Sequence, residues 1–115
     1  REFPTSKGIQ LRDFCYVEDI VEGIFKILQT TAALGQVYNL ASGRGVTIRS
    51  MLETIVGITG SGRPDFGKVA YRPGENMELV ADVGKAVREL AWNPPTTLDD
   101  GLRRTIGYYR ELWKK

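Results

Sequence analysis

The sequence predicts an α/β fold, because helical hydrophobic patterns alternate with short strand patterns along most of the chain. Four stretches have the apolar spacing of a helix, and three have the composition or alternation of a strand. The chain has 115 residues, of which 42% are hydrophobic, and this is enough to form a buried core without disulfides or metals. We therefore expect residues 1–115 to fold as a single unit.

The first strand is expected at 11–17, where apolar and polar residues alternate with a period near two. A helix follows, with Asp19 as its predicted N-cap, and Gly35 ends this part of the pattern. The helix carries a wide apolar stripe made of Ile20, Val21, Ile24, Phe25, Ile27 and Leu28. Such a stripe predicts a helix that is buried over much of its surface.

A second, buried strand is expected at 36–41, before a glycine-containing loop at 42–45. Thr47 is the predicted N-cap of a second helix. Helical spacing relates the apolar residues of this helix, which are Ile48, Met51, Leu52, Ile55 and Val56. The next segment, 57–67, contains four glycines and one proline, so we interpret it as a loop.

The third strand is expected at 68–72 and ends at a Pro-Gly pair. Asp82 is the predicted cap of a third helix, which closes at Asn-Pro-Pro, 93–95. Thr97, with Asp100 three residues later, resembles a capping box at the start of the last helix. The inward faces of these two helices are Val83, Ala86, Val87, Leu90 and Ala91, then Leu98, Leu102, Ile106, Tyr109 and Trp113.

Composition excludes several classes of function. The 16 Lys and Arg residues nearly balance the 14 Asp and Glu residues, which leaves little electrostatic attraction to nucleic acid. The chain has no histidine and one cysteine, Cys15, so a structural zinc site, a Ser-His-Asp triad and a Cys-His pair are excluded. No apolar run is long enough to cross a membrane, and no targeting leader opens the sequence. We expect a cytoplasmic protein with no membrane partner.

The sequence contains neither a complete dinucleotide-binding glycine loop nor a Tyr-x-x-x-Lys pair. Two glycine-rich loops, at 43–45 and 60–62, lack the third glycine of G-x-G-x-x-G and are interpreted as turns. No tyrosine is followed four residues later by lysine, and the helix dipole explains why Asp99 and Asp100 stand in a first helical turn. The sequence offers no candidate catalytic, cofactor-binding or metal-binding residue.

Two arginines and a glutamate form the best candidate binding site. Arg12 lies in the first predicted strand, and Arg72 ends the third, just before the Pro-Gly turn that leads to Glu75. Two guanidinium groups at strand ends suit a diphosphate, because their paired donors match phosphate oxygens, and Glu75 is suited to accept hydrogen bonds from ribose hydroxyls. The alternative interpretation is that Arg12 pairs with Asp13 or Glu18 at the surface and that Arg72 covers a sheet edge.

Several motifs occur in the order found in a known family. Residues 12–19 resemble R-D-[FWY]-x-[YH]-V-x-D, residues 35–43 resemble G-x-x-Y-N-L-G-[ST]-G, and residues 71–75 resemble a segment carrying R-x-G-[DE]. The segments 81–86, 90–94 and 97–102 complete the match, which covers nearly the whole chain from about Gly8. These are motifs of the extended short-chain dehydrogenase/reductases that act as nucleotide-sugar epimerases and dehydratases.

The resemblance implies partial Rossmann-edge strands and a helix, joined to the small C-terminal substrate-binding domain. By position, Arg12 and Arg72 correspond to family residues that contact the diphosphate of a nucleotide-diphospho-sugar, and Glu75 to the one that contacts the ribose. The family's N-terminal Rossmann half, with its glycine-rich loop, Tyr-x-x-x-Lys pair and catalytic serine or threonine, is not matched. We therefore expect the isolated chain to bind no cofactor and to be inactive, whereas a complete relative uses NAD(P).

A lone C-terminal portion is expected to expose a sheet edge and an apolar helix face. These surfaces favour pairing with another chain, either a second copy in a homo-oligomer or a separate Rossmann half. The leading hypothesis is the nucleotide-sugar-binding part of an epimerase or dehydratase. The alternatives are a stand-alone, non-catalytic binding module and an oligomer-forming structural remnant.

Overall fold

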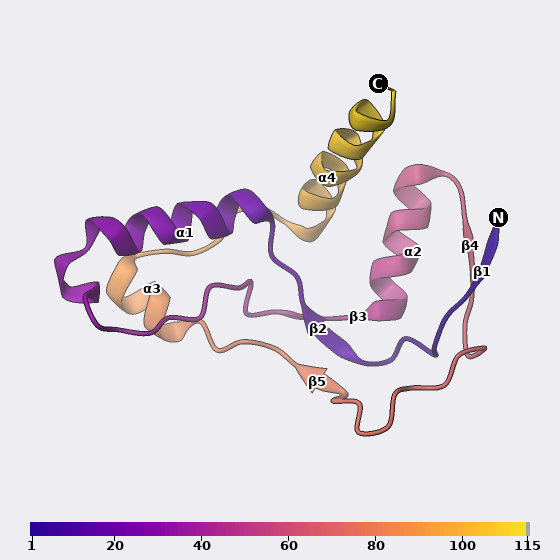
Figure 1. Ribbon diagram of the computed structural model, residues 1–115, viewed down its shortest axis with the longest axis horizontal. Helices are drawn as coiled ribbons and strands as arrows, with labels where there is room; N and C mark the ends of the chain where they lie inside the picture. The colour runs from indigo at the N-terminus through magenta and orange to yellow at the C-terminus, as the bar shows by residue number, and fades with distance from the viewer. Residues whose placement is uncertain (115) are drawn as a thin grey trace.

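Short strands and four α-helices alternate along the chain in a computed structural model, which describes residues 1–114. The molecule is flat, measuring 50 × 40 × 20 Å, and α2 and α4 rise side by side from one edge (Figure 1). The strands are β1 (Glu2–Pro4), β2 (Leu11–Asp13), β3 (Gly45–Thr47), β4 (Arg63–Asp65) and β5 (Glu78–Leu79). The helices are α1 (Val17–Gln29), η1 (Thr31–Ala33, a 3-10 turn), α2 (Ile48–Thr59), α3 (Gly84–Leu90) and α4 (Leu98–Trp113). The predicted α/β class is confirmed.

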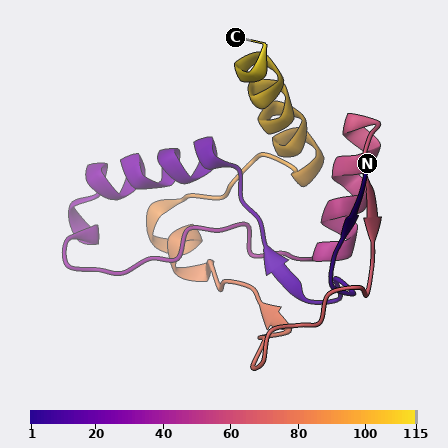
Figure 2. The same ribbon diagram turned by 45° about the vertical axis from the view of Figure 1, so that its right-hand side comes forward.

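The strands form two small sheets. Strand β1 pairs in parallel with β4, and β2 lies between β3 and β5 in a three-stranded sheet. The register places Arg12 opposite Val46 of the antiparallel strand β3 and opposite Leu79 of the parallel strand β5. In Figure 2 the sheet containing β2 lies below the facing ends of α1 and α4. This sheet joins segments far apart in the sequence.

Side-chain caps define two helix starts as predicted. The hydroxyl of Thr47 accepts the amide of Ser50 at 3.1 Å, and that of Thr97 accepts the amide of Asp100 at 3.2 Å. Asp82, the predicted cap of α3, is not its N-cap residue, because Val83 occupies that position. The Asp82 carboxylate nevertheless accepts the amide of Gly84, the first residue of α3, at 2.9 Å. Helix α2 continues into the predicted loop and ends before Gly60, which is left-handed with φ 70°.

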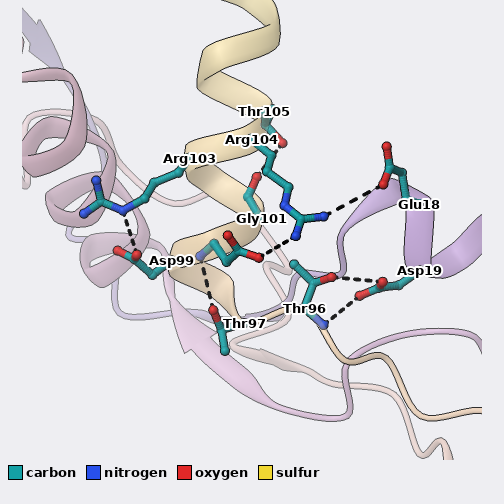
Figure 3. A network of polar contacts seen from close by, with 10 residues as sticks. Glu18, Asp19, Thr96, Thr97, Asp99, Gly101, Arg103, Arg104 and Thr105 are labelled. Atoms are coloured by element: carbon teal, nitrogen blue, oxygen red, sulfur yellow. Dashed lines mark hydrogen bonds and ion pairs between the residues drawn. The ribbon is translucent and has the colours of Figure 1, made fainter.

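Asp19 does not cap α1, so this prediction is wrong. The helix begins after Tyr16, and Asp19 is a buried residue of its first turn, with 5% of its surface exposed. Its carboxylate accepts the amide of Thr96 at 3.1 Å and the Thr96 hydroxyl at 3.0 Å (Figure 3). The Asp19 carboxylate therefore accepts hydrogen bonds from a distant segment and not from the first backbone amides of its own helix, as a cap would.

Two strand predictions, 36–41 and 68–72, are also wrong, and a third is too long. Within residues 1–114 no strand pairs with 36–41, which is irregular and is connected to α3 by side chains. The Lys85 ammonium donates to the Val37 carbonyl at 3.0 Å, and the Tyr38 hydroxyl donates to Glu89 at 3.0 Å. The first strand stops at Asp13 rather than at residue 17.

The irregular segment 68–72 meets the rest of the chain through isolated hydrogen bonds. The Val69 amide donates to the Thr5 carbonyl at 2.9 Å, and the Tyr71 hydroxyl accepts the Ile9 amide at 3.1 Å. A turn at Gly67, with φ 85°, bends the chain before a ladder forms. The pairing occurs instead between β1 and β4, and β4 lies within the predicted loop 57–67.

The main core surrounds Trp92, which has 1% of its surface exposed. Ala33, Ala86 and Leu90 pack with it, and its indole N–H donates to the Asp19 carbonyl at 2.9 Å. Gly23 lets α1 approach closely, because a Cβ there would lie 3.1 Å from the Trp92 ring. This core covers one side of α1.

The opposite side of α1 is uncovered, which corrects the expectation of a helix buried over much of its surface. Its exposed apolar residues, called here the α1 apolar face, are Val17, Val21, Ile24, Phe25 and Leu28. In the described residues, 1–114, the core cluster packs against the Trp92 side of α1 and not against this face. Among residues 1–114, no helix is both long and apolar enough to span a membrane.

Replacing Trp92 tests whether the core depends on this side chain. We expect Trp92→Phe to lower the free energy of unfolding by about 2–4 kcal/mol, because it leaves a cavity and deprives a buried carbonyl of its donor. Trp113→Phe is the matched control, because Trp113 is 81% exposed, and its effect should stay within about 0.5 kcal/mol. Urea denaturation measures both, and equal effects would contradict this account of the core.

Candidate functional site

Arg12 occupies the central strand of the three-stranded sheet, and its guanidinium is held on two sides. Its Nη1 donates to the Leu11 carbonyl at 2.7 Å, and its Nη2 donates to Glu75 Oε1 at 3.1 Å. The two side chains are 23% and 18% exposed. Removal from bulk water strengthens such a pair relative to a fully exposed one. The sheet therefore presents an ordered cation next to an ordered carboxylate.

Within residues 1–114, Arg12 pairs with neither of its alternative partners, Asp13 and Glu18. Glu18 lies 4.0 Å from Arg104, which also pairs with Asp100 of its own helix at 3.1 Å (Figure 3). The Asp13 carboxylate is occupied by other donors. The sequence predicted that Arg12 and Glu75 contact one ligand and did not predict that they pair with each other. In the structure, Arg12 Nη2 lies 3.1 Å from Glu75 Oε1.

A tight turn connects Glu75 to the second candidate arginine. The Glu75 amide donates to the Arg72 carbonyl at 3.0 Å, around Pro73 and Gly74. Gly74 has φ 75°, as the third position of a type II turn requires. Arg72 is exposed, and its side chain makes no hydrogen bond or ion pair with any residue from 1 to 114. It lies in this turn and not, as predicted, at a strand end.

Asp13 is a polar residue of the site that the sequence analysis did not select. Its carboxylate accepts the Ser42 amide at 2.8 Å, the Ser42 hydroxyl at 2.6 Å, the Gly43 amide at 2.8 Å and the Ala81 amide at 3.3 Å. Partial burial favours the protonated acid, but these hydrogen bonds outweigh it and hold the pKa of Asp13 below its ordinary value. The sequence held two signals for Asp13: its place at the end of a predicted strand and its place in the R-D-[FWY] motif. Neither signal shows that these four donors converge on its carboxylate.

The glycine turns of this chain do not fit the pyrophosphate of a dinucleotide. The Gly43 amide donates to Asp13 at 2.8 Å, so it is not available to a phosphate. The amide of Ser50, in the first turn of α2, donates to the Thr47 hydroxyl. Gly60 ends a helix rather than preceding one, whereas dinucleotide binding needs free amides at a helix N-terminus.

A separate cleft of about 630 Å³ opens between α4 and the segment that leads into α1. Its lining is mainly apolar and aromatic and includes Phe14, Tyr16, Leu98, Leu102 and Tyr108. Cys15 also lines the cleft, and burial, followed by the charges of Asp19 and Asp13, raises the pKa of its thiol. Arg12, Arg72 and Glu75 lie outside this lining. The cleft is therefore separate from the group of Arg12, Arg72 and Glu75, called here the arginine site.

Residues 2–105 match the family model described as GDP-mannose 4,6 dehydratase. The chain is 34% identical over 110 residues to dTDP-glucose 4,6-dehydratase of Salmonella typhimurium. This match covers 90% of this chain and 30% of the relative. It also resembles the crystal structure of UDP-glucose 4-epimerase from Thermotoga maritima with UDP-glucose. That match has a TM-score of 0.86 and 28% identity, over 98% of this chain and 36% of the epimerase.

A third relative was solved with both a nucleotide sugar and a cofactor. UDP-glucuronic acid 4-epimerase from Bacillus cereus, in complex with UDP-glucuronic acid and NAD, matches with a TM-score of 0.81 and 30% identity. The match covers 95% of this chain and 36% of the epimerase. The chain thus spans about a third of the length of the relatives it matches.

The raised pKa of Cys15 predicts a weakly reactive thiol, because the thiolate is the nucleophile. At pH 8 we expect iodoacetamide to alkylate Cys15 of the folded chain several-fold more slowly than Cys15 of the same chain in 8 M urea. The folded rate should continue to rise above pH 9, where the thiolate fraction is still increasing. Mass spectrometry follows the modification, and equal rates at pH 8 in both states would contradict the prediction.

Proposed function

Because the chain belongs to the GDP-mannose 4,6-dehydratase family of extended short-chain dehydrogenase/reductases, we propose that it is the part of a nucleotide-sugar epimerase or dehydratase that binds the nucleotide-diphospho-sugar. The observation that carries this proposal is the ordered Arg12–Glu75 pair beside the turn that bears Arg72. One guanidinium group and one carboxylate are thus held together next to a turn that carries a second guanidinium group.

The two arginines divide the recognition of the diphosphate. Arg12 is already oriented by Glu75 and by the Leu11 carbonyl, so it binds one phosphate with little loss of side-chain entropy. Arg72 is exposed and closes on the second phosphate when the ligand arrives. Bidentate arginine–phosphate hydrogen bonds are stronger than neutral ones and specify the geometry of the ligand.

Glu75 has two tasks in this proposal. Its Oε1 accepts from Arg12 at 3.1 Å, and its Oε2 makes no hydrogen bond with another residue of the 1–114 range. Oε2 is thus available to accept from a ribose hydroxyl. The same carboxylate then orients the phosphate-binding cation and contacts the sugar of the nucleotide.

Binding and orientation of the substrate are the proposed contribution of this chain to the reaction. Relatives hold NAD or NADPH, and a bound NAD(P) supplies the hydride chemistry in a complete enzyme. The residues described above do not fit its pyrophosphate, so we propose that a Rossmann half carries the cofactor and the catalytic groups. By itself, this chain is proposed to bind its ligand without turnover.

The α1 apolar face supports a second proposal, in which the chain associates with another polypeptide. Five large apolar side chains on one side of one helix are between 45% and 75% exposed, and soluble proteins rarely leave such a patch uncovered. A second copy of the chain covers it in a homo-oligomer. A Rossmann half covers it when one is present.

Substitution of either arginine tests the binding proposal. We expect Arg12→Ala and Arg72→Ala each to weaken nucleotide-sugar binding by about 10–100-fold, since a lost charged hydrogen bond costs about 1.5–3 kcal/mol. NMR titration with UDP-, dTDP-, GDP- and CDP-sugars measures the affinity and identifies the base. Arg103→Ala is the matched control, because within residues 1–114 Arg103 pairs with Asp99 of its own helix alone, at 2.7 Å. Unchanged affinity in both arginine variants would remove the proposed site.

Light scattering at rising protein concentration tests self-association. We expect a mass above that of the monomer, and we expect Ile24→Asp to weaken association by at least tenfold because it puts a charge into the α1 apolar face. Ile9→Asp is the control: Ile9 is 55% exposed against 48% for Ile24, and it lies outside α1. A monomer at all concentrations, or equal effects of the two substitutions, would contradict the proposed homo-oligomer.

A further inference from the structure

We infer that Asp13 is a positioning residue for the phosphate-binding arginine, acting by linking β2 to the segments on both sides of it. The inference rests on the proposed function for its binding consequence. Its structural part, the placement of Arg12, stands on the geometry of the sheet. Asp13 follows Arg12 directly, and consecutive strand residues project to opposite faces, so Asp13 acts from the face opposite the ligand.

The need for such a residue follows from the length of the strands. The β2–β3 ladder joins three residue pairs and the β2–β5 ladder joins two. A slip of β2 by one residue would turn Arg12 to the other face of the sheet. So few backbone hydrogen bonds specify the register weakly, and a further interaction is required to place Arg12.

The Asp13 carboxylate supplies that interaction at the point where the ladders end. Its donors on one side, Ser42 and Gly43, lead directly into β3, which begins at Gly45. Its donor on the other side, Ala81, follows β5, which ends at Leu79. One side chain therefore links all three strands of the sheet. Hydrogen bonds to a charged acceptor are also stronger than those of the neutral ladder.

The position of β5 decides where the rest of the site lies. The turn that bears Arg72 and Glu75 runs into β5, and the Leu11 amide donates to the Met77 carbonyl at 2.9 Å beside it. The Asn76 side chain accepts the Glu78 amide at 3.0 Å and stiffens this connection. When Asp13 holds β5 in register with β2, Glu75 lies 3.1 Å from Arg12. Loss of the link releases both partners of the pair.

The first experiment observes Arg12 without any ligand. Asp13→Asn replaces one acceptor oxygen by a donor facing backbone amides, so the side chain cannot accept from all of them. We expect the Arg12 Nε–H resonance to move to the position of a solvent-exposed arginine and its NOEs to Glu75 to disappear. The Trp92 indole resonance should persist and report an intact core. Ser42→Ala removes the hydroxyl donor to Asp13, together with the hydroxyl's hydrogen bonds to the Arg44 backbone, but it leaves the three amide donors to Asp13 in place. It should therefore produce a smaller shift in the same direction.

Asp82→Asn is the matched control. Asp82 also accepts a backbone amide, that of Gly84, in the same stretch of chain, but within residues 1–114 it makes no hydrogen bond with a residue of β2. Its substitution should leave the Arg12 resonance in place. The conservative Asp13→Glu variant retains the charge and both acceptors, and it should recover part of the Arg12 shift.

The second experiment measures the dissociation constant for UDP-glucose in the same variants. We expect at least a tenfold increase for Asp13→Asn and less than twofold for Asp82→Asn. An Arg12 resonance that stays in place in both Asp13→Asn and Ser42→Ala would overturn the inference, whether or not the chain binds ligand. A resonance that moves in a chain that binds no nucleotide sugar, even in its natural form, would support the positioning role and refute the proposed function instead.

Discussion

The strands of this molecule are too short to define the fold by themselves, and this constraint explains its other features. No strand within residues 1–114 exceeds three residues, and few ladder hydrogen bonds are available to hold segments that lie far apart in the sequence. Buried or half-buried carboxylates provide the missing connections. Asp13 joins residues 29 and 68 positions away, and Asp19 joins a residue 77 positions away. Such long-range links place the helices and the arginine site.

The one-sided core has a related origin. Trp92 packs against α1 at Gly23, and its indole N–H donates to the Asp19 carbonyl at 2.9 Å. A single residue therefore fills the core and supplies a hydrogen-bond donor to a backbone carbonyl. No equivalent side chain within the described part of the chain lies over the α1 apolar face. The moderate size of the core and the flat shape follow from this asymmetry. Association with other polypeptide would complete the burial that the hydrophobic pattern of α1 demands.

Local signals predicted the local structure well. Apolar spacing located the four helices, and Thr47 and Thr97 cap α2 and α4 as their positions before apolar stripes suggested. Non-local structure was harder to predict. Residues 36–41 have the composition of a buried strand, but strand formation also needs a neighbour to pair with. Asp19 is a residue type that often caps helices, yet its carboxylate accepts hydrogen bonds from Thr96. Helix propensity describes local preferences and does not show where distant donors lie in the fold.

The same difference between local and non-local information applies to the candidate site. Arginine chemistry and the family motifs selected Arg12, Arg72 and Glu75, whereas the 3.1 Å contact between Arg12 and Glu75 depends on a register that only the folded sheet defines. In the proposed function this difference has a chemical consequence. Arg12 is ordered before binding, while Arg72 must lose side-chain freedom when it meets the ligand. Under that proposal, a nucleotide with one phosphate would engage Arg12 alone, and only a diphosphate would offset the entropy that Arg72 loses on ordering. The two arginines would then favour nucleoside diphosphates over monophosphates.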